Sequence, residues 1–121
     1  MVYLSYMKAI AGIDLAEVSR FSPMAKDRKH AFLKKVFSPE EIAYCFSRSN
    51  TAQHLAGMFA AKEAASKALG VEKYPFAEIE VRHTESGAPQ AWSRKTGRKL
   101  KVSISITHTS SIAAAVAVGI Q

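Results

Sequence analysis

Three charged residues, Lys62, Glu63 and Lys67, lie inside the most strongly helical segment of the chain, Leu55 to Gly70. At about 100° per residue the apolar residues of this segment form one stripe, and Lys62 projects into its middle. Glu63 lies at the edge of the stripe with Lys67 just beyond it, so a carboxylate between two ammonium groups is aimed at the protein body. The segment alone leaves two interpretations open: a functional group, or a snorkelling lysine beside an ordinary i,i+4 surface pair.

Asp14 and His108 are the candidate partners of this helix. Asp14 follows an apolar segment predicted as the first strand, Lys8 to Ile13, and His108 follows an alternating segment predicted as a later strand. Polar side chains at strand ends can converge beside a helix that covers the sheet. Asp14 and Glu63, without a further Cys or His ligand, favour a hard cation such as Mg²⁺, with Lys67 as phosphate-binding charge. Asp14 as the cap of a turn and His108 as a turn histidine remain the alternatives.

The pattern of elements predicts an α+β fold in which an antiparallel sheet packs on the long helix. Ser38-Pro39-Glu40-Glu41 is typical of a helix start, with Ser38 as N-cap and Glu41 closing a capping box. Strands are expected at residues 8–13, 76–83, 89–92, 102–107 and 112–120, and helices at 24–36, 38–47 and from 50 or 51 to 69.

The composition indicates a single domain of 121 residues with a net charge of +7. The apolar runs are far shorter than the roughly 20 residues of a membrane span, no signal sequence is evident, and Cys45 is the only cysteine. We therefore expect a cytoplasmic protein without an internal disulfide. Basic residues cluster at 26–35 and at 94–101, which suits an acidic protein, a phosphorylated small molecule or a nucleic acid.

Several segments together resemble the holo-acyl-carrier-protein synthases, the short group of 4′-phosphopantetheinyl transferases, over nearly the whole chain. The most specific is Phe59-Ala60-Ala61-Lys62-Glu63-Ala64-Ala65-Ser66-Lys67-Ala68, which is similar to the signature Phe/Trp-Ala-Ala-Lys-Glu-Ala…Lys of that family. The other matching segments are Gly12 to Phe21, Phe37 to Ile42, Ser86 to Pro89 and Val102 to Thr109. The resemblance implies the 4′-phosphopantetheinyl transferase fold, assembled as a homotrimer with active sites shared between subunits.

The resemblance also implies a reaction: transfer of the 4′-phosphopantetheine arm of coenzyme A to a serine of an apo acyl carrier protein, with release of 3′,5′-ADP. Asp14 and Glu63 would hold Mg²⁺ against the diphosphate of coenzyme A, and Lys67 would pair with the same oxygens. A metal-ordered water, with Glu63 or Asp14 behind it, is the preferred general base. The expected coenzyme A ligands are Lys62, Lys67, Gly87, Pro89, His108 and Thr109.

A basic helix, predicted from Met24 to Val36, is the expected docking surface for the acidic carrier protein. Complementary charge would raise the encounter rate and set the orientation of the two proteins. The residues expected to contact the carrier are Arg20, Met24, Lys26, Arg28 and Lys34.

Three features depart from the family pattern. The family usually reads Ser-His directly, whereas Ile106-Thr107 precedes His108 here. Met58 stands where family members often have an arginine, and His30, Arg48 or His54 are the candidates to compensate for it. Residues 1–6 precede a natural start at Met7 and are expected to be an N-terminal extension with little role.

Two further functions are weighed against the transferase. The charge of +7 would suit a small nucleic-acid-binding domain, but aromatic residues are not interleaved with the basic ones, and Asp14 and Glu63 would be unexplained. A family member that binds coenzyme A without turnover is the second alternative, and the presence of both carboxylates with Lys62 and Lys67 argues against it.

Overall fold

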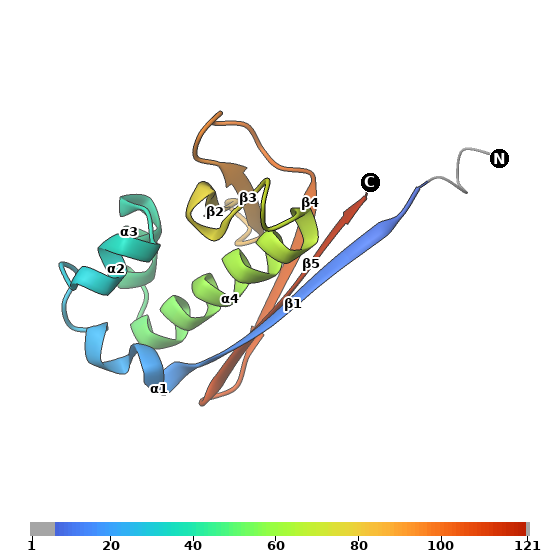
Figure 1. The fold of residues 1–121 in the computed structure, drawn as a ribbon. Coiled ribbons are helices and arrows are strands. Elements are labelled where there is room, and N and C mark those ends of the chain that lie inside the picture. Colours follow the sequence, from blue (N-terminus) through green and yellow to red (C-terminus); the bar gives the residue numbers. More distant parts are fainter. Residues whose placement is uncertain (1–6, 121) are drawn as a thin grey trace.

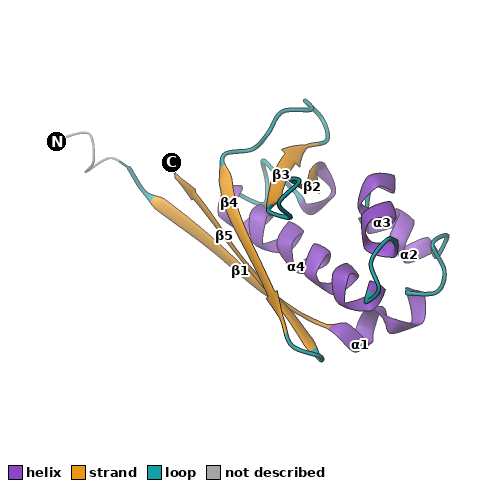
Figure 2. Ribbon diagram, turned by 180° about the vertical axis from the view of Figure 1, so that it is seen from behind, coloured by secondary structure: helices purple, strands orange, loops and turns teal. Residues whose placement is uncertain are grey.

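A three-stranded antiparallel sheet carries the longest helix on one of its faces (Figures 1 and 2). The computed structural model describes residues 7–120; the predicted extension, residues 1–6, lies outside them. The sheet has the order β1-β5-β4 and the helix is α4. Their bounds are Ala9–Glu17 for β1, Ile112–Ile120 for β5, Val102–His108 for β4 and Thr51–Leu69 for α4. This arrangement confirms the predicted α+β fold with an antiparallel sheet on a long helix.

Small side chains let α4 lie close to the sheet. Every second residue of β5 from Ala113 to Ala117 is a buried alanine, and these residues point toward the helix. The helix meets them with alanines of its own: Ala60, Ala61, Ala64, Ala65 and Ala68 are all buried. Side chains without branches or length leave the backbones free to approach, so the contact depends on close packing more than on the area of any one side chain.

A separate hairpin packs beside α4. It consists of β2 (Ile79–His83) and β3 (Pro89–Ser93), which form a two-stranded sheet of their own, preceded by the short 3₁₀ helix η3 (Phe76–Glu78). Gly87 in the connecting turn has φ +91°, which glycine adopts without steric cost. The predicted single strand at 76–83 therefore begins as a 3₁₀ turn and becomes extended only at Ile79.

Short helices gather at the N-terminal end of α4 (Figure 1). They are α1 (Val18–Phe21), η2 (Ser22–Met24), α2 (Ala31–Val36) and α3 (Pro39–Phe46). The capping box predicted for α3 is present: the Glu41 backbone N–H donates to Ser38 Oγ, and the Ser38 backbone N–H donates to the Glu41 carboxylate. Phe21, Phe32 and Phe59 form an aromatic cluster that joins these helices to α4.

Two further predicted boundaries are wrong. The basic helix expected from Met24 to Val36 is only six residues long, because Asp27 and His30 turn the chain: the Asp27 carboxylate accepts from the Lys29 backbone, and His30 Nδ1 accepts from the Phe32 backbone. The first strand does not end at Asp14 but continues to Glu17, because β5 pairs with it along its whole length. Asp14 therefore lies inside a strand, opposite Ala115.

Among residues 7–120, no helix combines the length and the apolar character that crossing a lipid bilayer would require.

Candidate functional site

Asp14 and Lys67 meet where α4 crosses the edge strand β1. The Lys67 ammonium donates to the Ile13 backbone carbonyl at 3.0 Å, and it lies 3.4 Å from Asp14 Oδ1. The Lys67 side chain is 47% exposed and that of Asp14 is 19% exposed. The ion pair is thus open to solvent on the lysine side, where an incoming anionic group can reach the ammonium.

Gly12 makes this close crossing of β1 and α4 possible. A Cβ built at Gly12 would clash with the backbone oxygen of Ala64, and it would lie 2.9 Å from both the Ala68 nitrogen and Lys67 Cβ. No residue with a side chain fits there without moving strand and helix apart. The glycine at the start of the predicted motif is therefore explained by helix packing.

Glu63 lies on the same flank of α4 as Lys67, one helical turn before it. From Gly12, β1 runs toward Phe21, whose ring lies 5.6 Å from that of Phe59. Asp14 follows Gly12 by two residues, about 7 Å along the strand. The structure brings Asp14 and Lys67 together, whereas the joint action of Glu63 with them stays a prediction.

The donor set of this site suits an oxygen-preferring cation. Within the described residues no group of three or more His, Cys, Asp or Glu side chains is arranged to hold a metal ion. A cation bound by Asp14 and Glu63 alone would complete its shell with water and with oxygens of a ligand, which is how Mg²⁺ is commonly held beside phosphates.

Lys62 is placed differently from the prediction, and its assignment as a coenzyme A ligand is corrected. Its side chain is fully buried, and its ammonium lies 2.8 Å from both Glu41 Oε1 and the Val36 carbonyl oxygen. The rings of Phe37 and Phe76 lie on two sides of the ammonium, at 5.5 and 4.7 Å. Burial lowers the pKa of Lys62, while the carboxylate of Glu41 opposes that shift. Lys62 does not reach the surface and has a structural role.

Glu41 connects three parts of the chain, α3, α4 and β2, which its place in a capping box does not reveal. Besides closing the α3 cap and pairing with Lys62, it accepts a 2.7 Å hydrogen bond at Oε2 from the Val81 backbone in β2. The sequence predicts only the first of these contacts. The other two depend on tertiary packing between segments that are about 20 and 40 residues away.

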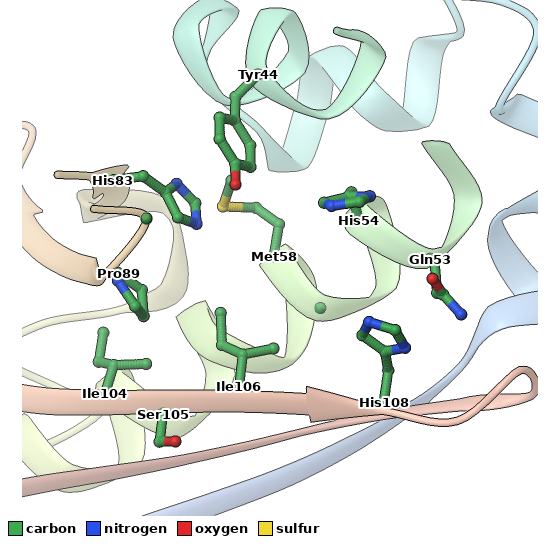
Figure 3. Close-up of a pocket in the computed structure, with 12 residues that line it drawn as sticks. Tyr44, Gln53, His54, Met58, His83, Pro89, Ile104, Ser105, Ile106 and His108 are labelled. Atoms are coloured by element: carbon green, nitrogen blue, oxygen red, sulfur yellow. The ribbon is translucent and has the colours of Figure 1, made fainter. Parts of the chain in front are cut away.

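A pocket of about 260 Å³ opens between α4, the β2–β3 hairpin and β4 (Figure 3). Three predicted coenzyme A ligands, Gly87, Pro89 and His108, line it. Thr109 follows at its rim, where its backbone oxygen accepts a hydrogen bond from Gln53. The other lining residues are Tyr44, Gln53, His54, Gly57, Met58, His83, Ile104, Ser105 and Ile106.

Tyr44 and His83 form one wall of this pocket, and neither is predicted as a site residue from the sequence. Their rings stack at 3.8 Å with an angle of 6° between the planes. Burial lowers the pKa of His83, and the charges of Arg48 and His54 lower it further. A signal for His83 exists in the sequence: it continues the buried side of β2 after Ile79 and Val81.

The Asp14 site and the pocket lie at opposite edges of the sheet. The strand order β1-β5-β4 places Asp14 on one edge and His108 on the other. On α4, Met58 faces the pocket, while Glu63 is turned from it by about 140° around the helix axis. A single chain therefore presents two separate parts of a potential site.

The residues predicted to contact a carrier protein are distributed over α1, η2, the following turn and α2. Arg20 lies over the ring of Phe59 at 4.9 Å, and Arg28 lies over the ring of Phe46 at 5.6 Å. Met24 packs against the core with part of its side chain exposed. Lys26 and Lys34 are exposed. The surface is basic with aromatic and apolar support, although it is not one continuous helix.

The outer face of the three-stranded sheet is apolar and exposed. Ile13 and Leu15 of β1 are each 65% exposed, and the outward residues of β5 are aliphatic as well. These are Ile112, Val116, Val118 and Ile120. An apolar patch of this kind, continuous across two paired strands, is typical of a protein-protein contact.

Comparison with known proteins gives a consistent family. Residues 10–117 match the family model described as the 4′-phosphopantetheinyl transferase superfamily. The holo-[acyl-carrier-protein] synthase of Halothermothrix orenii is 41% identical over 118 residues, which cover 89% of this chain and 94% of the relative. That of Moorella thermoacetica is 37% identical, covering 88% and 90%.

Solved structures agree with the sequence comparisons. The Helicobacter pylori holo-[acyl-carrier-protein] synthase in complex with coenzyme A is 31% identical with a TM-score of 0.73, covering 93% of this chain and 100% of the other. The Bacillus anthracis holo-(acyl-carrier-protein) synthase in complex with CoA (3′,5′-ADP) is 30% identical with a TM-score of 0.71, covering 90% and 93%.

Proposed function

Because this chain belongs to the 4′-phosphopantetheinyl transferase superfamily, we propose that it converts an apo acyl carrier protein to its holo form. The 4′-phosphopantetheine arm of coenzyme A is transferred to a serine hydroxyl of the carrier, and 3′,5′-ADP leaves. The observation that carries the proposal is the ion pair of Asp14 and Lys67, with Glu63 one helical turn before Lys67, in a chain that spans nearly the full length of relatives named for this reaction.

The chemistry is displacement at the β-phosphorus of coenzyme A. The serine oxygen forms a bond to phosphorus, the bond to the oxygen of the departing 3′,5′-ADP breaks, and the serine proton passes to a base. Lys67 is half exposed and held beside Asp14, so its ammonium can pair with diphosphate oxygens as charge moves onto the leaving group. Glu63 or Asp14, acting through an ordered water, is the proposed route for the serine proton.

Asp14 and Glu63 are the proposed ligands of Mg²⁺. Bound there, Mg²⁺ would neutralise the charge of the diphosphate during the transfer. The support is the donor set: two carboxylates beside a phosphate-binding lysine, without nitrogen or sulfur ligands arranged for a softer metal among residues 7–120.

The nucleotide part of coenzyme A is proposed to bind in the pocket lined by Gly87, Pro89 and His108. Since this pocket and the Asp14 site lie at opposite edges of one sheet, we propose that neighbouring copies of the chain complete each active site. The exposed apolar face of the sheet supports such association, and a closed trimer is the assembly that the family resemblance implies. The cytoplasmic location stays a prediction from the sequence.

The basic surface over α1, η2 and α2 is proposed to receive the acyl carrier protein. Its positive side chains complement an acidic partner, and Met24 offers an apolar contact among them.

Mass spectrometry of an apo acyl carrier protein, incubated with the enzyme, coenzyme A and Mg²⁺, tests the proposal. We expect the mass of one phosphopantetheine group to be added. Asp14→Asn and Glu63→Gln should lower the rate at least 100-fold with unchanged circular dichroism, because an amide keeps the shape but loses the charge. Glu72→Gln, in the exposed turn after α4, is the matched control and should be active.

Coenzyme A binding without transfer would instead favour a non-catalytic family member. Binding of nucleic acid, with neither transfer nor coenzyme A binding, would favour the nucleic-acid-binding alternative. Near-normal turnover of either carboxylate variant at limiting Mg²⁺ would contradict the proposed metal site.

A further inference from the structure

Three of the four histidines of this chain line one pocket (Figure 3). His54 comes from α4, His83 from β2 and His108 from the end of β4, so tertiary folding alone brings them together. The fourth, His30, caps α2 through its Nδ1 atom and does not line the pocket. The convergence of three imidazoles from three elements therefore requires an explanation of its own.

The charged and titratable groups around this pocket are all neutral or positive. They are Tyr44 of α3, Arg48 in the turn after α3, His54 of α4, His83 of β2 and His108 of β4. Arg48 lies 4.7 Å from the centre of the Tyr44 ring, which also stacks on His83 and lies edge-on to His54. No carboxylate is among the lining side chains, and β3 contributes only Pro89. The pocket therefore favours an anion.

Met58 occupies the centre of the α4 wall and carries no charge. The neutralising charge for an anionic ligand must come from the rim of the pocket. Of the three residues that the sequence offers as compensation for this methionine, the structure places His54 and Arg48 at the pocket and His30 elsewhere.

We infer that His54, His83 and His108, assisted by Arg48, bind the 3′-phosphate of the coenzyme A nucleotide as imidazolium ions, taking up protons from solvent on binding. This inference rests on the proposed placement of the nucleotide in the pocket. It makes recognition of the 3′-phosphate dependent on pH, whereas a site built on arginine would keep its charge at all accessible pH values.

The charges in the pocket determine whether the affinity for the 3′-phosphate rises or falls with pH. In the free protein, burial and the neighbouring positive groups lower the pKa of His83, so that it is largely neutral near pH 7. A phosphate dianion beside the imidazoles favours their protonated forms. Affinity for the 3′-phosphate is therefore high at low pH and falls as pH rises. Above about pH 7 the phosphate is already mostly dianionic, so that its own titration does not produce the fall.

Isothermal titration calorimetry with two nucleotides isolates the effect. The full-length protein is titrated in EDTA with 3′,5′-ADP and with adenosine 5′-monophosphate, which lacks the 3′-phosphate. The ratio of the two affinities should fall about fivefold or more between roughly pH 7 and pH 8.5. In buffers of different ionisation enthalpy, 3′,5′-ADP should take up about one proton more than the monophosphate near pH 7.5.

Substitutions of single histidines show which residues take up the protons when 3′,5′-ADP binds. His54→Gln and, separately, His108→Gln should reduce both the excess proton uptake and the affinity ratio at pH 7. His30→Gln, outside the pocket, should leave both unchanged and serves as the matched control. The wild-type measurement of proton uptake does not depend on the folding of any variant.

Two outcomes of these titrations would contradict the inference or the placement of the nucleotide. If both nucleotides bind and their affinity ratio is independent of pH, or if the proton uptake survives both substitutions, the histidine inference is wrong while the proposed nucleotide site stands. If neither nucleotide binds to the protein, the placement of the nucleotide in this pocket is wrong as well.

Discussion

At the scale of single residues, Gly12 controls how closely β1 approaches α4. Replacing it with alanine would push a methyl group against the backbone of Ala64 and Ala68. Overpacking of this kind costs about 1–3 kcal/mol, and the strand would move away from the helix together with Asp14. We therefore expect Gly12→Ala to lower the free energy of unfolding in urea and to reduce transfer activity as well.

Gly119 provides the matched control for this prediction. It is also a buried glycine of the same sheet, but an added Cβ there would meet its nearest atom, the Lys101 carbonyl oxygen, at the ordinary distance of 3.5 Å. Gly119→Ala should leave stability and activity close to those of the wild type. Equal stability of the two variants would show that the crossing of β1 and α4 adapts freely.

At the scale of elements, the buried pair of Lys62 and Glu41 joins α4 to α3 and β2. Removing one partner leaves a buried charge without its counter-charge, which costs about 3–5 kcal/mol. We expect Lys62→Met and Glu41→Gln to be strongly destabilising singly, and the double variant to lose at least 1 kcal/mol less than the sum of the two. Urea denaturation of the four proteins measures this coupling. Additive losses would mean that the pair contributes only packing.

The segment from α1 to α2 carries the proposed carrier surface. Reversing the charge of Arg28 and Lys34 to glutamate should raise the apparent KM for the carrier protein, while coenzyme A binding stays nearly unchanged. Wild-type activity at low carrier concentration should fall as salt rises, because exposed charges are screened over about 8–10 Å near physiological ionic strength. Equal losses of carrier and coenzyme A affinity would place this segment at the nucleotide site.

The sequence predicts elements best where the signal is local. The α3 start follows from Ser38 and Glu41 alone, and the alternation of β4 sets its length within one residue. The prediction of a long basic helix is wrong because Asp27 and His30 form side-chain hydrogen bonds to the backbone that compete with helix formation. The predicted end of β1 is wrong because pairing with β5 overrides the turn preference of Asp14.

The candidate site is predictable only in part for the same reason. Asp14 and Lys67 come together because Gly12, visible in the sequence, lets β1 cross α4 closely. The helical spacing in the sequence also places Glu63 one turn before Lys67. The burial of Lys62 against Glu41 and the stacking of Tyr44 on His83 depend on residues more than 20 positions apart. Such contacts leave no periodic signal in a single sequence.

At the scale of the whole molecule, the apolar outer face of the sheet is the proposed contact between copies of the chain. Val118 lies on this face, paired with Ala11 of β1 and Ser103 of β4. We expect Val118→Lys to shift the protein toward monomers in sedimentation velocity and to reduce transfer in parallel. Val71→Lys changes an exposed aliphatic residue outside the sheet and should leave the assembly intact. A fully active monomer would rule out a shared site.

Co-expression of two variants with defects in different parts of the site tests whether the Asp14 site of one subunit and the histidine pocket of another act together in transfer. One variant is Glu63→Gln, and the other carries His54→Ala with His108→Ala in its pocket. If each site draws its two parts from neighbouring subunits, random assembly of the two variants in equal amounts leaves about a quarter of all sites intact. Transfer to the carrier protein at limiting coenzyme A should then recover to about that fraction. Activity no higher than the sum of the two variants alone would contradict the account.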